Sequence, residues 1–355
     1  FTEEWETKPI NDLAVVIGGG TPDTTVKSYW DGEIQWFTPS EIGKTKYVDS
    51  SLRTITEDGL NNSSAKRLPP NTILLSSRAT IGECSLSLRE CATNQGFQSL
   101  VSKKCNVDFL YYLIQTKKND LIRKSCGSTF LEISANEVRK IQVSIPSDVE
   151  QQKIAGLLSL IDERIATQNK IIDKLQSLIK GITQNITLHN KPNVRISECL
   201  ECTSSTLQES DALRSGTYPV YGANGIVGYL DNYSTQDEAV YIIKDGSGVG
   251  TVSYVTGQCS TTGTLNTLQA KEGYSLQYLY YILKVFNFEP YKTGMAIPHI
   301  YFKDYGKAKI FCPSYTKQLQ YARLLSAIDG KVSTEQNSLA SLSLQKQYLL
   351  RQMFI

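Results

Sequence analysis

The sequence has few of the residues on which enzyme sites depend. Only two histidines occur among 355 residues, His189 and His299, and they lie far apart along the chain. Neither the H-E-x-x-H pattern of zinc peptidases nor the G-x-S-x-G pattern of serine hydrolases is present. The carboxylates are scattered without a pattern that would pair two of them. The sequence is therefore poorly supplied with recognisable catalytic motifs.

Long apolar runs are also lacking. No stretch is apolar over the length needed to cross a bilayer. The first six residues, FTEEWE, are acidic and lack the apolar core of a secretory signal. We therefore expect a cytoplasmic protein without a membrane partner.

A strong net charge is absent as well. The formal net charge is +2, and the stretches 1–147 and 188–313 each contain nearly equal numbers of basic and acidic residues. If the chain binds nucleic acid, basic residues must gather on one face, or a partner must contribute much of the phosphate contact.

The cysteines do not follow a disulfide or metal pattern. Eight are present, without the spacing of a small disulfide scaffold, so free thiols are expected in a chain of this size. Cys199 and Cys202 form one C-x-x-C, but only His189 lies near as a further ligand. We therefore expect no bound metal in this chain.

A heptad pattern runs through residues 149–186. Apolar residues recur at alternating steps of four and three, as on the contact face of a coiled coil, and no proline interrupts them. The positions of this seam are Ile154, Leu158, Ile161, Ile165, Gln168, Ile172, Leu175, Ile179, Ile182 and Ile186. Gln168 is its one polar member. A helix of this length would measure roughly 57 Å.

The same pattern occurs again at the C-terminus, with Tyr321 in the place of Ile154. The second seam is Tyr321, Leu325, Ile328, Val332, Glu335, Leu339, Leu342, Lys346, Leu349 and Met353. Its polar residue Glu335 coincides with Gln168, and the approach to the helix also repeats at the same offset, with Pro146, Ser147 and Gln151 matching Pro313, Ser314 and Gln318. A long internal repeat indicates two similar units, each a globular part followed by a long helix.

The repeat predicts an α+β fold with a pseudo-two-fold internal repeat. Two mixed α/β domains, 1–147 and 188–313, are each followed by a long helix, 148–187 and 314–355, and each helix has the seam of a coiled coil. Residues 190–193 form the linker between the halves. Within the first domain, residues 108–124 predict one amphipathic helix.

The glycine-rich stretch 246–250 allows two interpretations. It could cradle a phosphate, but a dinucleotide site needs a helix directly after the glycines. The next residues, TVSYVT, are β-branched and aromatic, which favours a hairpin turn between two strands.

Several loops of the first domain carry side chains suited to DNA. Arg78, in a turn of small residues with Ser77 and Thr80, could pair with guanine, and the amides of Asn94 and Gln95 suit adenine. Two further loops interleave aromatic and basic residues, as in Lys27, Ser28, Tyr29 and Trp30 and in Lys44, Lys46 and Tyr47. Any one of these could be an ordinary polar turn, but together they favour recognition.

These motifs, taken together, resemble the specificity (S) subunits of type I restriction–modification enzymes over nearly the whole chain. GGGTPDTTVKSYWDGEIQWFTPSEI (18–42), ILLSSRATIG (73–82), TNQGF (93–97) and GSTFLEIS (127–134) are similar to a target-recognition domain of that family. IPSDVEQQKIAGLLSLID resembles its first spacer helix. YPVYGANGIVGYLD (218–231), GSGVGTV (246–252) and GMAIPHI (294–300) resemble a second recognition domain of another subtype.

The resemblance implies that the two long helices pack as an antiparallel coiled coil. It also implies a non-catalytic subunit of a bacterium or archaeon, without a cofactor of its own, that reads a bipartite, asymmetric site in double-stranded DNA. Two methyltransferase subunits would bind it, and translocase–nuclease subunits would join for restriction. S-adenosylmethionine, and ATP with magnesium, are expected on those partners. The resemblance adds DNA-binding candidates within its motifs and between them, namely Ser128, Tyr221, Asn224, Lys244, Ser247, Thr262, Thr264, Asn266, Met295 and His299.

Two other functions remain open on the residues alone. One is a coiled-coil adaptor whose globular ends bind protein instead of DNA. The other is a nucleotide-dependent enzyme that uses the 246–250 loop. Salt-sensitive DNA binding distinguishes the first from a DNA-reading subunit, and a nucleotide that fails to raise the melting temperature excludes the second.

Overall fold

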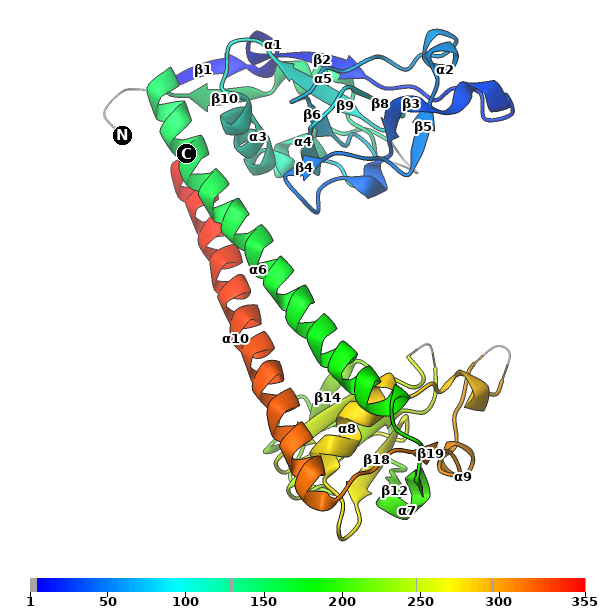
Figure 1. Cartoon of the computed structure of the whole chain (residues 1–355). Coiled ribbons are helices and arrows are strands. Elements are labelled where there is room, and N and C mark those ends of the chain that lie inside the picture. Colours follow the sequence, from blue (N-terminus) through cyan, green and yellow to red (C-terminus); the bar gives the residue numbers. More distant parts are fainter. Residues whose placement is uncertain (1–4, 128–130, 247, 295–296, 355) are drawn as a thin grey trace. The chain divides into compact units, whose positions relative to one another are not determined.

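The computed structural model describes residues 5–127, 131–246, 248–294 and 297–354. The chain divides into two compact units. Unit 1 consists of Phe1–Lys170 with Asn337–Ile355, and unit 2 of Ile171–Gln336. Each unit holds one globular part together with portions of two long helices, α6 (Asp148–Leu188) and α10 (Tyr315–Met353) (Figure 1).

A mixed five-stranded sheet forms the centre of unit 1, with the strand order β2-β9-β6-β7-β4. A three-stranded sheet, β5-β3-β8, and the pair β1-β10 complete it. The strands are β1 (Glu6–Pro9), β2 (Ala14–Gly18), β3 (Trp30–Phe37), β4 (Tyr47–Val48), β5 (Arg53–Ile55), β6 (Ile73–Leu75), β7 (Cys84–Ser87), β8 (Cys91–Thr93), β9 (Gln98–Ser102) and β10 (Gln142–Ile145). The helices are α1 (Ile10–Leu13), α2 (Glu57–Asn61), α3 (Val107–Thr116), α4 (Lys118–Arg123) and α5 (Ala135–Lys140).

Unit 2 repeats this topology. Its sheets have the orders β12-β18-β15-β16 and β14-β13-β17, and β11 pairs with β19. The strands are β11 (Val194–Arg195), β12 (Leu200–Ser204), β13 (Tyr218–Gly222), β14 (Gly225–Leu230), β15 (Glu238–Ile243), β16 (Val252–Thr256), β17 (Ser260–Thr261), β18 (Leu265–Ala270) and β19 (Lys309–Ile310). The helices are α7 (Ile196–Cys199), α8 (Leu276–Val285) and α9 (Phe302–Tyr305). In both units the smaller sheet combines one parallel and one antiparallel pairing.

The seam residues of the long helices are buried or half-buried, as the heptad pattern predicts. In unit 1, Ile154 and Leu158 of α6 belong to the main core, and Leu349 and Met353 of α10 pack against that core. In unit 2, the other ends of the helices meet the core through Ile186 and Ala322. Because the start of one helix shares a core with the end of the other, the two helices run antiparallel.

A buried glutamine ties each long helix to its globular part. Gln151, 2% exposed, accepts a hydrogen bond at 3.0 Å from the backbone N–H of Asn106, the N-cap residue of α3. Gln318, also 2% exposed, accepts one at 2.9 Å from the N–H of Ser275, the N-cap residue of α8. Each glutamine also donates to the carbonyl of the preceding proline, Pro146 or Pro313. The repeat therefore extends to the hydrogen bonds that fix the helix to the domain.

The helix predicted over residues 108–124 is in fact two helices, so this prediction was wrong in part. The backbone N–H of Lys117 donates to the carbonyl of Ile114 at 3.0 Å, which closes α3 with a tighter turn before α4 begins. The turn prediction for residues 246–250 is confirmed. Strands β15 and β16 pair antiparallel on either side of it, with Ile242 opposite Val252.

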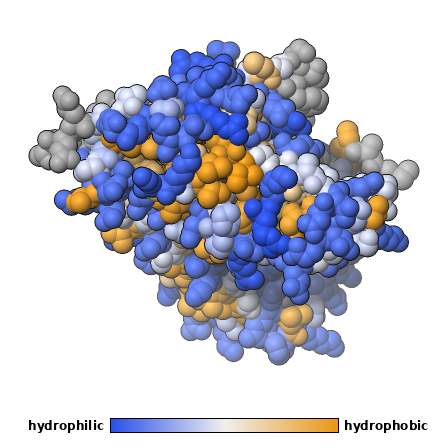
Figure 2. All heavy atoms as spheres, turned by 90° about the horizontal axis from the view of Figure 1, so that it is seen from above, coloured by the Kyte–Doolittle hydropathy of each residue, from blue (hydrophilic) through white to orange (hydrophobic). Residues whose placement is uncertain are grey.

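Surface polarity is mixed. On the face shown in Figure 2, hydrophilic side chains predominate, and the hydrophobic ones gather in separate groups. Among the helices of the described ranges, none combines the length and the apolar character needed to cross a membrane.

Candidate nucleic-acid interface

Three loops of unit 1 meet where β6 ends and β9 begins. The backbone N–H of Ser77, just after β6, donates to the carbonyl of Gly96 at 2.8 Å. The N–H of Ile133 donates to the carbonyl of Ser77 at 3.1 Å. We call the described parts of residues 76–83, 94–97 and 125–133 the loop junction of unit 1. Because backbone hydrogen bonds hold it, its side chains can vary without loss of the loop path.

Unit 2 contains the same junction. The N–H of Lys244, just after β15, donates to the carbonyl of Thr264 at 3.0 Å, and the N–H of Ile300 donates to the carbonyl of Lys244 at 2.9 Å. The sequence repeat aligns Lys244 with Ser77 and Ile300 with Ile133, at the same offset as the two helix seams. The described parts of residues 244–251, 261–264 and 293–300 form the loop junction of unit 2.

Arg78 lies in the first junction and contacts a carboxylate from another of its loops. Its Nη2 atom is 2.8 Å from Oε2 of Glu132, and 42% of the Arg78 side chain is exposed. The arginine Nε atom is buried, and among the described residues nothing accepts a hydrogen bond from it. The turn continues through Ala79, whose φ of 56° is left-handed. The guanidinium is thus fixed by Glu132 at Nη2, and part of the side chain remains accessible to solvent.

The other candidates of this junction differ in exposure. The Asn94–Gln95 loop is next to Arg78 through the Ser77–Gly96 hydrogen bond. Asn94 accepts from the N–H of Gly96 at 2.9 Å, and the exposed Gln95 accepts from the hydroxyl of Thr21 at 2.5 Å. Thr80 is exposed, whereas Ser77 is fully buried. Sequence reasoning therefore located loops that the structure brings together.

The candidates at 27–30 lie on a separate short helical turn, Lys27–Tyr29, followed by β3. Lys27 and Ser28 are exposed, and Tyr29 is half-buried. Trp30 is only 6% exposed and belongs to a core cluster. The guanidinium of Arg53 lies 3.5 Å from the centre of the Trp30 ring. Of this group, Lys27 and Ser28 present their side chains to solvent.

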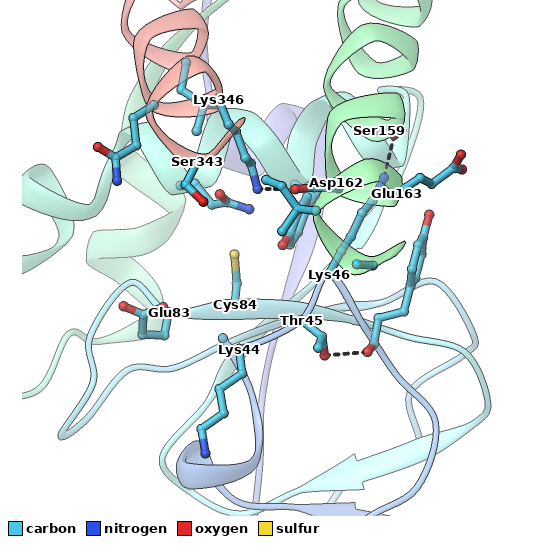
Figure 3. Close-up of a pocket in the computed structure, with 18 of the residues that line it drawn as sticks. Lys44, Thr45, Lys46, Glu83, Cys84, Ser159, Asp162, Glu163, Ser343 and Lys346 are labelled. Atoms are coloured by element: carbon cyan, nitrogen blue, oxygen red, sulfur yellow. Dashed lines mark hydrogen bonds and ion pairs between the residues drawn. The ribbon is translucent and has the colours of Figure 1, made fainter. Parts of the chain in front are cut away.

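Lys46 is directed into the protein, beside a cavity of about 750 Å³ in unit 1. Its side chain is 6% exposed, and its Nζ atom is 2.6 Å from both Asp108 of α3 and Ser159 of α6. Figure 3 shows Lys46 reaching toward Ser159, while Lys44 lies apart from these groups. Lys44 and Tyr47 are exposed. Lys46 therefore links the loop that precedes β4 to α3 and to the long helix α6.

A second ion pair lies across the same cavity. Lys346 of α10 is 2.6 Å from Asp162 of α6, and both side chains are less than one-fifth exposed (Figure 3). Asp162 also accepts a hydrogen bond at 2.7 Å from the hydroxyl of Tyr112. Burial raises the pKa of the lining thiol of Cys84 to about 12, which makes it a poor nucleophile. The arrangement joins the domain to both helices and has no reactive group of its own.

In unit 2, the candidates of the loop junction include His299, whose Nδ1 atom is 2.7 Å from Asp245. Lys244 and Thr264 are half-buried, and Thr262 is buried with its hydroxyl 2.8 Å from that of Thr264.

Two candidates lie on the smaller sheet of unit 2 and one in its interior. Asn224 is exposed at the turn between β13 and β14. Tyr221 is half-buried, and burial raises its pKa. Asn266 is 3% exposed, and its amide donates to Tyr305 at 3.0 Å. Three further candidates lie outside the described residues, namely Ser128, Ser247 and Met295.

Sequence reasoning missed the two carboxylates of the junctions, Glu132 and Asp245. Nothing local marks them as functional. The signal that could have found them is the repeat, because its offset takes Arg78 to Asp245 and Glu132 to His299. Two positions that hold one acidic and one basic side chain in both copies suggest a contact.

The C-x-x-C cysteines do not point at a common site. Cys199 lies 3.9 Å from Cys312, Sγ to Sγ, and this contact lowers the pKa of Cys199 and raises that of Cys312. Burial raises the pKa of Cys202 to about 11. Within the described part of the chain, no three histidine, cysteine or acidic residues gather as a metal site would require.

Comparisons with known proteins agree along the chain. A family model described as "Type I restriction modification DNA specificity domain" matches residues 2–177 and 191–344. The type I restriction enzyme MjaIX specificity subunit of Methanocaldococcus jannaschii is 39% identical over 181 residues, which are 49% of this chain and 42% of that relative. The chain thus spans less than half of that relative. The EcoprrI specificity subunit of Escherichia coli is 25% identical over 384 residues, covering 98% of this chain and 92% of the relative.

A solved structure shares the fold. The crystal structure of a type I restriction–modification system S subunit from M. genitalium matches 100% of this chain and 97% of that one, with a TM-score of 0.66 and 18% identity. The expected fold of two mixed α/β domains and two long paired helices is confirmed.

Proposed function

The chain belongs to the type I restriction–modification DNA specificity family, and from that membership we propose that it reads a bipartite, asymmetric site in double-stranded DNA. The observation that carries this proposal is the loop junction, which occurs in both units with the same backbone hydrogen bonds. Its side chains differ between the units, with Arg78 and Glu132 in one and Asp245 and His299 in the other. A common scaffold with different side chains suits two different half-sites.

The proposal assigns roles to the parts of the chain. Residues 1–147 and 188–313 are the two recognition domains, and 148–187 and 314–355 are the spacer helices. Side chains that lie exposed in or beside the junctions, including Arg78, Gln95 and His299, contact DNA. The subunit itself catalyses nothing. S-adenosylmethionine binds to methyltransferase subunits, and ATP with magnesium to restriction subunits.

The exposed face of α6 supports docking of such partners. Leu157 is 43% exposed and Leu160 is 61% exposed, on a helix whose seam residues are turned inward. Leu157 and Leu160 are three residues apart and so are neighbours on one face of the helix, and exposed apolar side chains that adjoin one another mark protein contact sites. We propose that two methyltransferase subunits bind along the helices and contribute much of the contact with phosphates, which is consistent with the small net charge of +2.

The test is to map methylated bases across the genome of a methylation-free host that expresses this chain with its methyltransferase. We expect a single motif of two unlike half-sites separated by a fixed gap, and no methylation when this chain is omitted. Methylation that is independent of the chain, or a chain that binds its partners but leaves DNA unbound at low salt, would favour a coiled-coil adaptor instead.

A further inference from the structure

The two loop junctions contain equivalent contacts between a carboxylate and a basic side chain, with the order of the two exchanged. In unit 1 the cation, Arg78, follows the central strand β6, and Glu132 approaches from a second loop. In unit 2 the acid, Asp245, follows β15, and His299 approaches from the equivalent loop. Isolated backbone bridges join Arg78 to Glu132 and Asp245 to His299. The pairs therefore occupy equivalent places by geometry as well as by the offset of the sequence repeat.

The fold does not depend on these ion pairs. The side chains are 42% and 37% exposed in unit 1 and 36% each in unit 2, so each pair is screened by solvent. The loops are already joined by backbone hydrogen bonds, from Ile133 to Ser77 and from Ile300 to Lys244. What each contact does determine is the direction in which the guanidinium of Arg78 or the imidazole of His299 presents its remaining nitrogen atoms.

A carboxylate beside the cation also changes what the cation attracts. A lone arginine at a DNA surface binds any phosphate, irrespective of sequence. When a carboxylate lies at 2.8 Å, as for Arg78, the pair is close to neutral, and the carboxylate repels phosphate. A fixed guanidinium can still donate to guanine, and a carboxylate can accept from the amino group of cytosine.

We propose that Glu132 and Asp245 are specificity-determining positioning residues of the two reading loops. Each carboxylate orients its partner, the guanidinium of Arg78 or the imidazole of His299, toward base edges and disfavours contact of the pair with phosphate. This inference rests on the proposed function, because it concerns how the same loops read DNA. The reversed polarity places a donor after β6 and an acceptor after β15, so the two half-sites differ at equivalent positions.

The test uses the complex of the full chain with its methyltransferase and two duplexes, one with the mapped site and one without it. For Glu132→Gln we expect tighter binding to the duplex without the site, because a negative charge is removed. The ratio of specific to non-specific affinity should fall at least about fivefold, the lower end of what one good base contact contributes. In the methylation map, one half-site should accept more than one base at the affected position, and the other half-site should keep its sequence. Asp245→Asn should give the same result in the opposite half-site.

Glu137 provides a matched control. It pairs with Lys140 at 3.1 Å on α5 and is 35% exposed, close to the 37% of Glu132, but it lies outside the junction. Glu137→Gln removes the same charge and should leave the affinity ratio and the motif unchanged. If Glu132→Gln behaves as Glu137→Gln does, the inference is overturned.

A second variant separates orientation from charge. The double substitution Arg78→Glu with Glu132→Arg keeps the pair and the net charge but exchanges its ends, so the fold should persist and the wild-type motif should be lost in one half-site. Retention of the wild-type motif would contradict the inference. Alkylation of Cys126, which is exposed and bridged to Glu132, reports on the loop in each variant, and its rate should match the wild type without DNA.

The same experiments distinguish this inference from the function on which it rests. If the wild-type complex shows no preference for any site, the proposed function itself fails. If the wild type discriminates and both carboxamide variants discriminate equally well, only the role of Glu132 and Asp245 fails.

Discussion

The guanidinium of Arg78 combines restraint with exposure, which is what a base contact needs. Glu132 holds one edge, and 42% of the side chain remains accessible. A side chain that is already ordered loses less entropy when it binds than a free one does. The local sequence identified the arginine, since it stands in a turn of small residues, but not its partner, which comes from a distant loop.

We predict that Arg78→Ala weakens binding to the mapped site by about 1–3 kcal/mol, the range for one good base contact. The measurement is a titration of labelled duplex with the methyltransferase complex, together with the methylation map. Arg89→Ala is the control, because Arg89 pairs with Asp49 at a turn outside the junction and is 66% exposed. Unchanged affinity and an unchanged motif in Arg78→Ala would refute the base contact.

Lys44 and Lys46 are close in sequence but have different surroundings. Lys44 is exposed, whereas Lys46 is 6% exposed between Asp108 and Ser159. We predict that Lys46→Ala lowers the free energy of unfolding by about 1–3 kcal/mol, less than for a fully buried pair. The reason for the smaller loss is that Asp108 is 33% exposed. Thermal unfolding measures the effect.

Lys44→Ala should leave the stability almost unchanged and weaken DNA binding. We expect its stability to stay within about 0.5 kcal/mol of the wild type, because the site is on the surface. Its DNA affinity should fall, with a salt slope smaller by about one, if Lys44 contacts a phosphate. A Lys46→Ala variant with the stability of the wild type and a reduced affinity for DNA would show that Lys46 contacts DNA and does not stabilise the fold.

At the scale of the element, predictions from spacing hold where one periodicity governs a long stretch. The seam from Ile154 to Ile186 was predictable because its apolar residues repeat at fixed steps. The break between α3 and α4 was not, because Lys117 has no glycine or proline to mark it. The loop junctions were predictable only as separate loops, since the hydrogen bonds of Ser77 join segments far apart in sequence.

Gln168 and Glu335, the matching polar positions of the two seams, are half-buried. Gln168 lies near Lys170, where the part of α6 in unit 1 ends, and Glu335 lies near Gln336, where the part of α10 in unit 2 ends. Glu335 forms an ion pair with Lys331 on its own helix. We predict that the double substitution Gln168→Leu with Glu335→Leu raises the melting temperature but permits alternative pairings, because polar seam residues specify register at a cost in stability. Calorimetry and the size distribution of the protein measure both effects. A single assembly with no rise in melting temperature would argue against a register role.

At the scale of the whole molecule, the repeat was the most informative feature of the sequence. Its constant offset predicted two similar units, and both have the same order of strands in the larger sheet, apart from β4 at the edge of the first. That strand order itself could not be predicted, because it depends on pairings between distant segments such as β6 and β9. The side chains that reach DNA remain a prediction.

The repeat also suggests that helix length determines the gap between half-sites. We predict that four helix-forming residues inserted after Lys170 and four after Gln336, at the boundaries of the two units, increase the preferred gap by about one or two base pairs. Four residues add about 6 Å and turn the helix by about 40° beyond a full turn, whereas one base pair adds about 3.4 Å. Contacts within each unit are left intact, and both half-sites should keep their bases.

The methylation map of the lengthened chain tests this prediction. Some loss of affinity is expected, because each added base pair rotates one half-site around the duplex by roughly 34°. Insertion of four residues after Gly273 is the control. It lengthens the turn between β18 and α8, where a Cβ on this glycine would meet no atom within 4 Å, and it should not change the gap. A motif with its original gap and new half-site bases would show that the length of the helices does not determine the gap.

The partial exposure of the junction ion pairs has a consequence for how such a protein evolves. To reverse the polarity of Arg78 and Glu132, an ancestor must pass through an intermediate in which one charge lacks its partner. In a core, that intermediate would lose several kcal/mol, a large part of a domain's stability. At 42% and 37% exposure the penalty is about 1 kcal/mol or less, because water solvates the orphaned charge. New half-sites can therefore arise by single substitutions, each tolerated by the domain that carries it.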